Sequence, residues 1–220
     1  MKYILTGSTG FVGSEVLAQL CRRSTVSSIV VLTRRPLPES TRADPKIQSI
    51  VMKDFNVYTD DVVEKIAGAD ACIWALGARA VVPEVEIDYP LALARAVLST
   101  RAPGSKPFRY IYCSGMFAER DQSKSLWFSQ RLRHIKGAAE NSIIACADEH
   151  KGSWETYIAK PGMVIKPAND GLKQMLTSPM GNIRVDELAA AMIDIVANGN
   201  EEQTFLNADL VAKGREVLCD

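Results

Sequence analysis

Short apolar runs rich in β-branched residues alternate along the chain with longer segments whose apolar positions recur at helical spacing. Because strands that alternate with helices pair in parallel, this pattern predicts an α/β fold with a doubly wound parallel sheet. The expected strands are Tyr3–Thr6, Ile29–Thr33, Ile47–Met52, Ala71–Leu76, Arg109–Cys113, Thr156–Ala159 and Thr204–Leu206. The expected helices are Phe11–Cys21, Leu91–Leu98, Leu126–Ala147 and Val185–Val196, followed by a terminal helix.

The pattern is interrupted between Ile165 and Ile183, where two prolines, two glycines and two asparagines occur. These turn-forming residues predict a loop on the ligand side of the sheet, where a lid would lie. The chain shows no internal repeat, low-complexity tract or flexible linker. Residues 1–220 are therefore expected to form one domain with a small C-terminal elaboration on the substrate side.

Composition narrows the class of partner. Hydrophobic residues make up 47% of the chain, and 26 lysines and arginines balance 26 aspartates and glutamates. A chain without net charge favours neither nucleic acid nor an anionic membrane, so a small molecule is the expected partner. The five cysteines are scattered without metal-binding spacing, which predicts buried thiols and no metal site. We see neither a signal peptide nor a membrane-spanning run, and expect a cytoplasmic protein.

A glycine-rich turn, TGSTGFVG, follows the first expected strand and opens the first expected helix. Gly7 permits a tight turn, Gly10 lets the main chain approach a pyrophosphate, and Gly13 lets the helix pack closely on the strand. The helix N-terminus adds free N–H groups and a partial positive charge. The alternative is a glycine turn without a ligand, but strand, helix and spacing all suit a dinucleotide. The predicted phosphate-binding residues are Gly7, Ser8, Thr9, Gly10, Phe11, Val12 and Gly13.

The residues after the second and third strands concern the adenosine half of such a ligand. A site selective for NAD usually places a carboxylate after the second strand, but here Arg34 and Arg35 stand in that position. A guanidinium group can pair with a 2′-phosphate, so NADP is favoured over NAD. The alternative is that both arginines are simply solvated. Asp54 and Phe55 are placed to flank the adenine, or else to cap the next turn.

Five short motifs occur in order along the chain: TGSTGFVG, TRRP after the second strand, DF at Asp54 and Phe55, WALG at residues 74–77 and KPG at residues 160–162. With these motifs, nearly the whole chain resembles the atypical short-chain dehydrogenase/reductases. The resemblance is greatest to their small branch of NmrA-like and Tat-interacting-protein-like members, which have a Rossmann fold with a reduced substrate lobe. It implies that Ser114 lies near the nicotinamide. It also implies further cofactor-lining residues, namely Ala75, Leu76, Gly77, Pro161, Gly162, Met163 and Val164.

The family's catalytic pair, YxxxK on the long helix, is only half present. Lys136 in the sequence LRHIKG matches the lysine, which by resemblance holds the nicotinamide ribose. The tyrosine position, one helical turn earlier, holds Leu132, which has no proton to give. His134 is a poor substitute, because two residues along a helix point it to nearly the opposite side. Ser129 lies on the Lys136 stripe. Three tyrosines lie near expected element ends, where packing is the favoured role: Tyr89, Tyr112 and Tyr157.

The leading hypothesis is an NADP-dependent oxidoreductase that acts on a small carbonyl or enone metabolite. Lys136 would orient the ribose and serve as proton donor or base, and Ser114 would bind the substrate oxygen. A second hypothesis is a regulatory or redox-sensing protein that binds NAD(P) without turnover. A third is a non-redox isomerase that uses the same pocket. The family resemblance also allows a homodimer.

Overall fold

A computed structural model describes residues 1–77, 82–167 and 181–219. Its centre is one sheet of seven strands, all paired in parallel, in the order β3-β2-β1-β4-β5-β6-β9. The doubly wound Rossmann fold expected from the sequence is confirmed. The strands are β1 (Lys2–Thr6), β2 (Ser28–Thr33), β3 (Ile47–Val51), β4 (Ala71–Trp74), β5 (Phe108–Cys113), β6 (Trp154–Lys160) and β9 (Thr204–Leu206).

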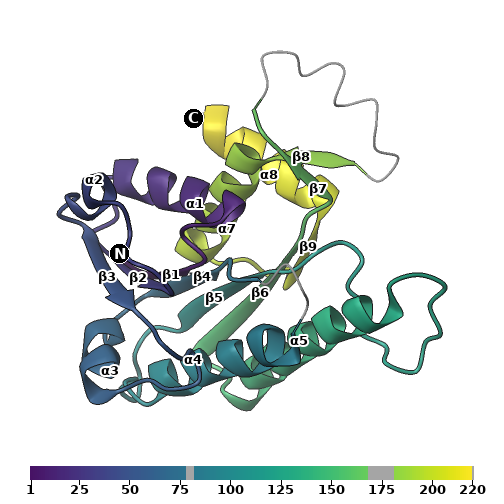
Figure 1. The fold of residues 1–220 in the computed structure, drawn as a ribbon, viewed down its shortest axis with the longest axis horizontal. Coiled ribbons are helices and arrows are strands. Elements are labelled where there is room, and N and C mark those ends of the chain that lie inside the picture. The colour runs from purple at the N-terminus through teal and green to yellow at the C-terminus, as the bar shows by residue number, and fades with distance from the viewer. Residues whose placement is uncertain (78–81, 168–180, 220) are drawn as a thin grey trace.

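Helices cover both faces of the sheet, as Figure 1 shows, and this explains the continuous apolar character of the strands. Successive strand residues point to opposite faces, so Leu5 joins the core on one side and Ile4 the core on the other. One face packs against α1 (Phe11–Arg22), α7 (Val185–Asn198) and α8 (Asn207–Cys219). The other packs against α3 (Asp60–Ile66), α4 (Tyr89–Leu98) and α5 (Gln130–Glu149).

The long helix begins later than its apolar pattern predicts. We expected a start at Leu126, but α5 begins at Gln130, because Ser129 has a left-handed backbone with φ of 46°. Such a residue cannot continue a right-handed helix. Trp127, in the non-helical part, is 91% exposed. The segment that would have formed the first turn of the helix is therefore a surface loop.

The helix expected at Leu91 starts earlier than predicted. It begins at Tyr89 and follows a π-helical segment, η1 (Glu84–Asp88), that the apolar period did not indicate. Two short helices also went unpredicted, α2 (Glu39–Arg42) and α3. Segments of seven residues or fewer span too few turns to show a helical period.

The predicted loop between Ile165 and Ile183 is wrong at both ends. Ile165 belongs to β7 (Met163–Ile165) and Ile183 to β8 (Asn182–Arg184), and these strands pair in parallel as a second small sheet. The pairing joins segments distant in sequence, which a local pattern cannot show. Residues 168–180 of the predicted loop lie outside the described residues. None of the helices in the described parts of the chain is both long and apolar enough to span a bilayer.

Candidate functional site

The strand order reverses between β1 and β4, and the glycine turn lies where both strands end. Gly7 has φ of 70°, and a Cβ atom there would stand 2.2 Å from the carbonyl oxygen of Ala75, just past β4. A Cβ atom on Gly13 would stand 2.2 Å from the carbonyl oxygen of Gly7. Neither position accepts a side chain, so both glycines bring backbones together at the edge where α/β sheets bind ligands.

The N-terminus of α1 offers donors to an anion. Gly10 is its N-cap, no side chain caps the helix, and the first turn carries no acidic residue. A Cβ atom on Gly10 would meet only the Gly7 carbonyl oxygen, at 3.2 Å, so that face of the turn is open. Ser8 is buried, and its Oγ has no hydrogen-bond partner among the described residues. The open turn and the unpaired hydroxyl group fit a diphosphate.

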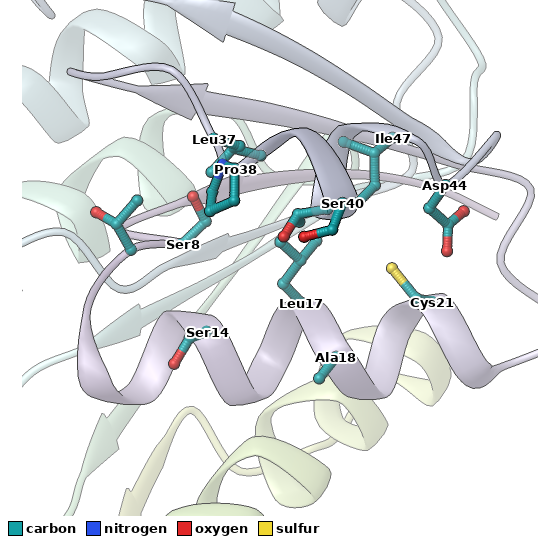
Figure 2. Close-up of a pocket in the computed structure, with 12 residues that line it drawn as sticks. Ser8, Ser14, Leu17, Ala18, Cys21, Leu37, Pro38, Ser40, Asp44 and Ile47 are labelled. Carbon is teal, nitrogen blue, oxygen red and sulfur yellow. The ribbon is translucent and has the colours of Figure 1, made fainter.

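Beside this turn, a cavity of about 490 Å³ extends between α1 and the short α2 (Figure 2). Ser8 and Thr9 of the turn line it. Cys21, near the end of α1, and Asp44, just past α2, line its other end. Its other lining side chains are mostly apolar or carry hydroxyl groups. Of the described residues that line it, Asp44 is the one ionisable residue besides Cys21, and none is a cation that could hold a 2′-phosphate.

The predicted adenosine-side residues differ in their surroundings. Arg34 and Arg35 are exposed, and neither forms an ion pair with a carboxylate of the described residues. Asp54 accepts the Asn56 main-chain N–H at 2.8 Å, so it caps its own turn, the alternative left open by the sequence. The Phe55 ring is buried and stacks on Tyr89 at 5.5 Å. Its ring therefore packs in the core, whereas the two arginines remain free for a phosphate.

Lys136 of α5 meets a buried carboxylate that sequence reasoning missed. Its Nζ donates to Oε2 of Glu86, from η1, at 3.0 Å. The Tyr112 hydroxyl, from β5, donates to the same oxygen at 2.7 Å. Burial, with the nearby Glu86 charge, raises the pKa of Tyr112 well above its ordinary value, so Tyr112 stays a donor near neutral pH. Burial likewise raises the pKa of the neighbouring Cys113 to about 11, so this thiol is protonated near neutral pH.

The same lysine reaches a second, largely apolar pocket of about 310 Å³. Leu132, at the position of the missing tyrosine, lines it and is 41% exposed. Among the described residues that line it, Lys136 is the only ionisable one and none is a tyrosine. The lining consists of Gly115, Met116, Phe117, Ala118, Leu132, Lys136, Pro161, Gly162 and Met163. The pocket therefore combines one cation with an apolar wall.

The KPG segment forms one wall of this pocket. Gly162 donates its N–H to Asn207 Oδ1 at 2.7 Å, and a Cβ atom on Gly162 would stand 2.4 Å from the Gly181 carbonyl oxygen. Met163 is exposed at the pocket, whereas Val164 pairs with Ile183 inside the small sheet. In the segment that follows β4, Leu76 is buried and Gly77 is exposed.

Ser114 lies at the end of β5, as expected, but its hydroxyl group is engaged. It donates to Oε1 of Glu140 at 2.5 Å. Glu140 is fully buried on α5, and its Oε2 accepts from Arg120 at 2.6 Å and from Lys160 at 3.1 Å. A buried carboxylate between two cations and a hydroxyl group has its charge and hydrogen bonds satisfied. A substrate oxygen could take the Ser114 proton only if this bond opened.

Glu140 could have been recognised in the sequence, but Glu86 could not. Glu140 interrupts the buried stripe of α5 between Gly137 and Ile143, and a charge on an apolar stripe signals a buried partner. Glu86 lies in η1, where no period marked an inward face. The remaining candidates lie away from the apolar pocket: Tyr89 on Phe55, Tyr157 against Glu155, Ser129 before α5, and His134, whose carbonyl oxygen accepts from Gln122.

A parallel sheet with a glycine turn at its reversal point defines a Rossmann-type dinucleotide-binding protein. The chain belongs to the NAD(P)H-binding family, whose model matches residues 7–199. The resemblance to the atypical short-chain dehydrogenase/reductases is thereby confirmed.

One relative and two solved structures illustrate the family and the fold. The chain is 30% identical over 199 residues to leucinostatins biosynthesis cluster protein T of Purpureocillium lilacinum. This match covers 80% of this chain and 70% of that protein. The reductase domain of PhqB from Penicillium fellutanum superposes with a TM-score of 0.70 at 21% identity, over 94% of this chain and 67% of that one. Yeast methylglyoxal/isovaleraldehyde reductase Gre2, complexed with NADPH, superposes with a TM-score of 0.71 at 14% identity, over 94% and 77%. The two structures support the fold alone.

Proposed function

We propose that this protein is an NADP-dependent oxidoreductase that acts on a small carbonyl or enone compound. One observation carries the proposal: the Lys136 ammonium group, anchored on Glu86, lines an apolar pocket. The glycine turn lies at the same edge of the sheet, after β1. A cofactor laid across that edge would join the two.

The described residues fit a nicotinamide dinucleotide. The turn of Gly7, Gly10 and Gly13 leaves room and N–H donors for the diphosphate, and the unpaired Ser8 hydroxyl group adds another donor. When bound, such a cofactor supplies or accepts a hydride. The residues proposed to line its other parts are Arg34, Arg35, Ala75, Leu76, Gly77, Pro161, Gly162, Met163 and Val164, whereas Asp54 is engaged in its own turn and Phe55 in the core.

Lys136 is proposed to hold the ribose next to the nicotinamide and to donate the proton that a reduced carbonyl oxygen requires. Lysine carries three N–H donors, and one is used on Glu86, so two remain for these contacts. Ser114 is retained as a candidate for binding the substrate oxygen, at the cost of its bond to Glu140. Because the Ser114 proton is held in that short hydrogen bond, Lys136 is the stronger candidate for the group that donates a proton to the substrate.

The pocket favours a substrate with an uncharged, apolar body. Its wall includes Met116, Phe117, Leu132 and Met163, and none of the described residues that line it offers a carboxylate to a cationic substrate. In a series of straight-chain aldehydes, kcat/KM with NADPH should rise about fourfold for each added methylene until the pocket is full, because each buried methylene contributes about 0.8 kcal/mol. The rate at which NADPH absorbance falls with each aldehyde measures kcat/KM across this series. A flat series, or no oxidation with any aldehyde, ketone or enone, would contradict the proposal.

The proposed preference for NADP depends on two arginines. Removing both, as Arg34→Ala with Arg35→Ala, should weaken NADPH binding about 10- to 100-fold, because charged hydrogen bonds contribute about 1.5–3 kcal/mol. The affinity for NADH should stay the same. Calorimetric titration of both coenzymes measures the difference, and Arg42→Ala, an exposed arginine of α2, is the matched control. Equal losses for NADPH and NADH would show that the arginines do not read the 2′-phosphate.

A second candidate function is a regulatory or redox-sensing protein of the NmrA type that binds the cofactor without turnover. Leu132 in the tyrosine position favours it, because the usual proton donor is missing. Tight NADPH binding with no oxidation across the substrate panel would select this function. For either function we propose a cytoplasmic protein, since all five cysteines lie in the described parts of the chain and are free thiols.

A further inference from the structure

Glu86 is a buried carboxylate of which the proposed reaction uses only one oxygen, the Oε2 that anchors Lys136. It is 1% exposed and comes from η1, the π-helical segment in front of α4. Single π-helical turns occur frequently at functional sites. Glu84, in the same segment, is exposed instead and bonds Asn56 at 2.9 Å. Two glutamates two residues apart thus have opposite environments.

Two elements, β5 and α5, each provide a hydrogen-bond donor to one oxygen of Glu86. Its Oε2 accepts from Tyr112 of β5 at 2.7 Å and from Lys136 of α5 at 3.0 Å. Because Tyr112 and the carboxylate are buried, they form a fixed support for the partly exposed lysine. A group that orients an acid or base in this way is a common feature of catalytic constellations.

The other oxygen of Glu86 has no partner. Among the described residues, Oε1 is buried and accepts no hydrogen bond. It faces Gly77, where a Cβ atom would stand only 3.9 Å away. A buried carboxylate oxygen without a donor is costly, and stable cores rarely keep one. Gly77 lies just past β4, which borders the reversal point of the sheet, so this unused acceptor lies near the edge where the cofactor is proposed to bind.

We infer that Glu86 is a cofactor-site residue with two roles: Oε2 positions Lys136, and Oε1 accepts a sugar hydroxyl group of the nicotinamide half of the dinucleotide. The inference rests on the proposed function, since it needs a dinucleotide in this crevice. It adds to that function a carboxylate that selects for a ribose hydroxyl group. Replacing Glu86 should therefore affect the nicotinamide half of the ligand and spare the adenosine half.

The test compares two ligands by calorimetric titration. NADPH contains both halves, whereas adenosine 2′,5′-bisphosphate contains only the adenosine half. Glu86→Gln keeps the shape but removes the charge, and should weaken NADPH binding about tenfold, the effect of losing one charged hydrogen bond. Its affinity for adenosine 2′,5′-bisphosphate should stay within about twofold of the wild type. Glu84→Gln, the same change on the exposed side of η1, should leave both affinities unchanged.

The outcomes separate the inference from the proposed function. A wild-type protein that binds neither ligand overturns both. If the wild type binds both ligands, two results for Glu86→Gln overturn the inference but not the proposed function. One is an unchanged affinity for NADPH. The other is an equal loss of affinity for both ligands, which indicates a purely structural role for Glu86. Should Glu86→Gln fail to fold, Tyr112→Phe removes one support of the carboxylate and keeps its charge. That variant should lose NADPH affinity a few-fold and keep its affinity for the bisphosphate. If its affinity for NADPH falls no more than its affinity for the bisphosphate, the inference is overturned.

Discussion

Replacing Gly7 with alanine should lower the free energy of unfolding by more than about 3 kcal/mol, a large part of the stability of a domain of this size. The new Cβ atom would lie 2.2 Å from the Ala75 carbonyl oxygen, and φ of 70° is strained for alanine. Since β1 and β4 pair side by side at the centre of the sheet, relief of the clash would disturb both strands. Denaturant unfolding followed by circular dichroism measures the loss.

Gly68 is the matched control for Gly7. It has nearly the same φ, 69°, but a Cβ atom there would have nothing within 4 Å. Gly68→Ala should therefore cost only the backbone term, about 1–2 kcal/mol. If both variants lose the same stability, the close approach of the Gly7 turn to β4 is not what requires glycine there.

Replacing Lys136 with methionine should lower kcat for any accepted carbonyl substrate by about 10²- to 10⁴-fold, the usual contribution of a positioned acid or base. Methionine fills similar space but has no N–H donors for the ribose or the substrate oxygen. Lys124→Met, an exposed lysine paired with Glu119 at 3.0 Å, is the control and should keep full activity. Undiminished turnover in Lys136→Met would remove this lysine from the mechanism.

The converse variant, Leu132→Tyr, supplies a phenol one helical turn before Lys136, at the wall of the same pocket. If Lys136 acts alone because the tyrosine is missing, the added acid should raise kcat/KM. A decrease together with weaker substrate binding would show that the apolar wall matters more than a second proton donor.

Much of the candidate site could be predicted because it depends on local sequence. The β1–α1 turn needs glycine at positions set by the turn itself, and an expected strand and helix flank it. Lys136 was located through its resemblance to the lysine of the family's YxxxK pattern. Glu86 escaped prediction because its inward direction depends on a π-helical turn and on donors from β5 and α5. The bond from Ser114 to Glu140 likewise joins two elements that only packing brings together.

By itself, the sequence determined the alternation of the main strands and helices and the glycine turn between the first strand and the first helix, because both are written in the period or spacing of neighbouring residues. The missing tyrosine followed from the family resemblance. The tertiary structure decided where the long helix begins, that β7 and β8 pair, and which carboxylates support Lys136 and occupy Ser114. Those outcomes depend on contacts between residues far apart in the chain. A hydrogen bond or strand pair of that kind leaves no regular trace in the local pattern.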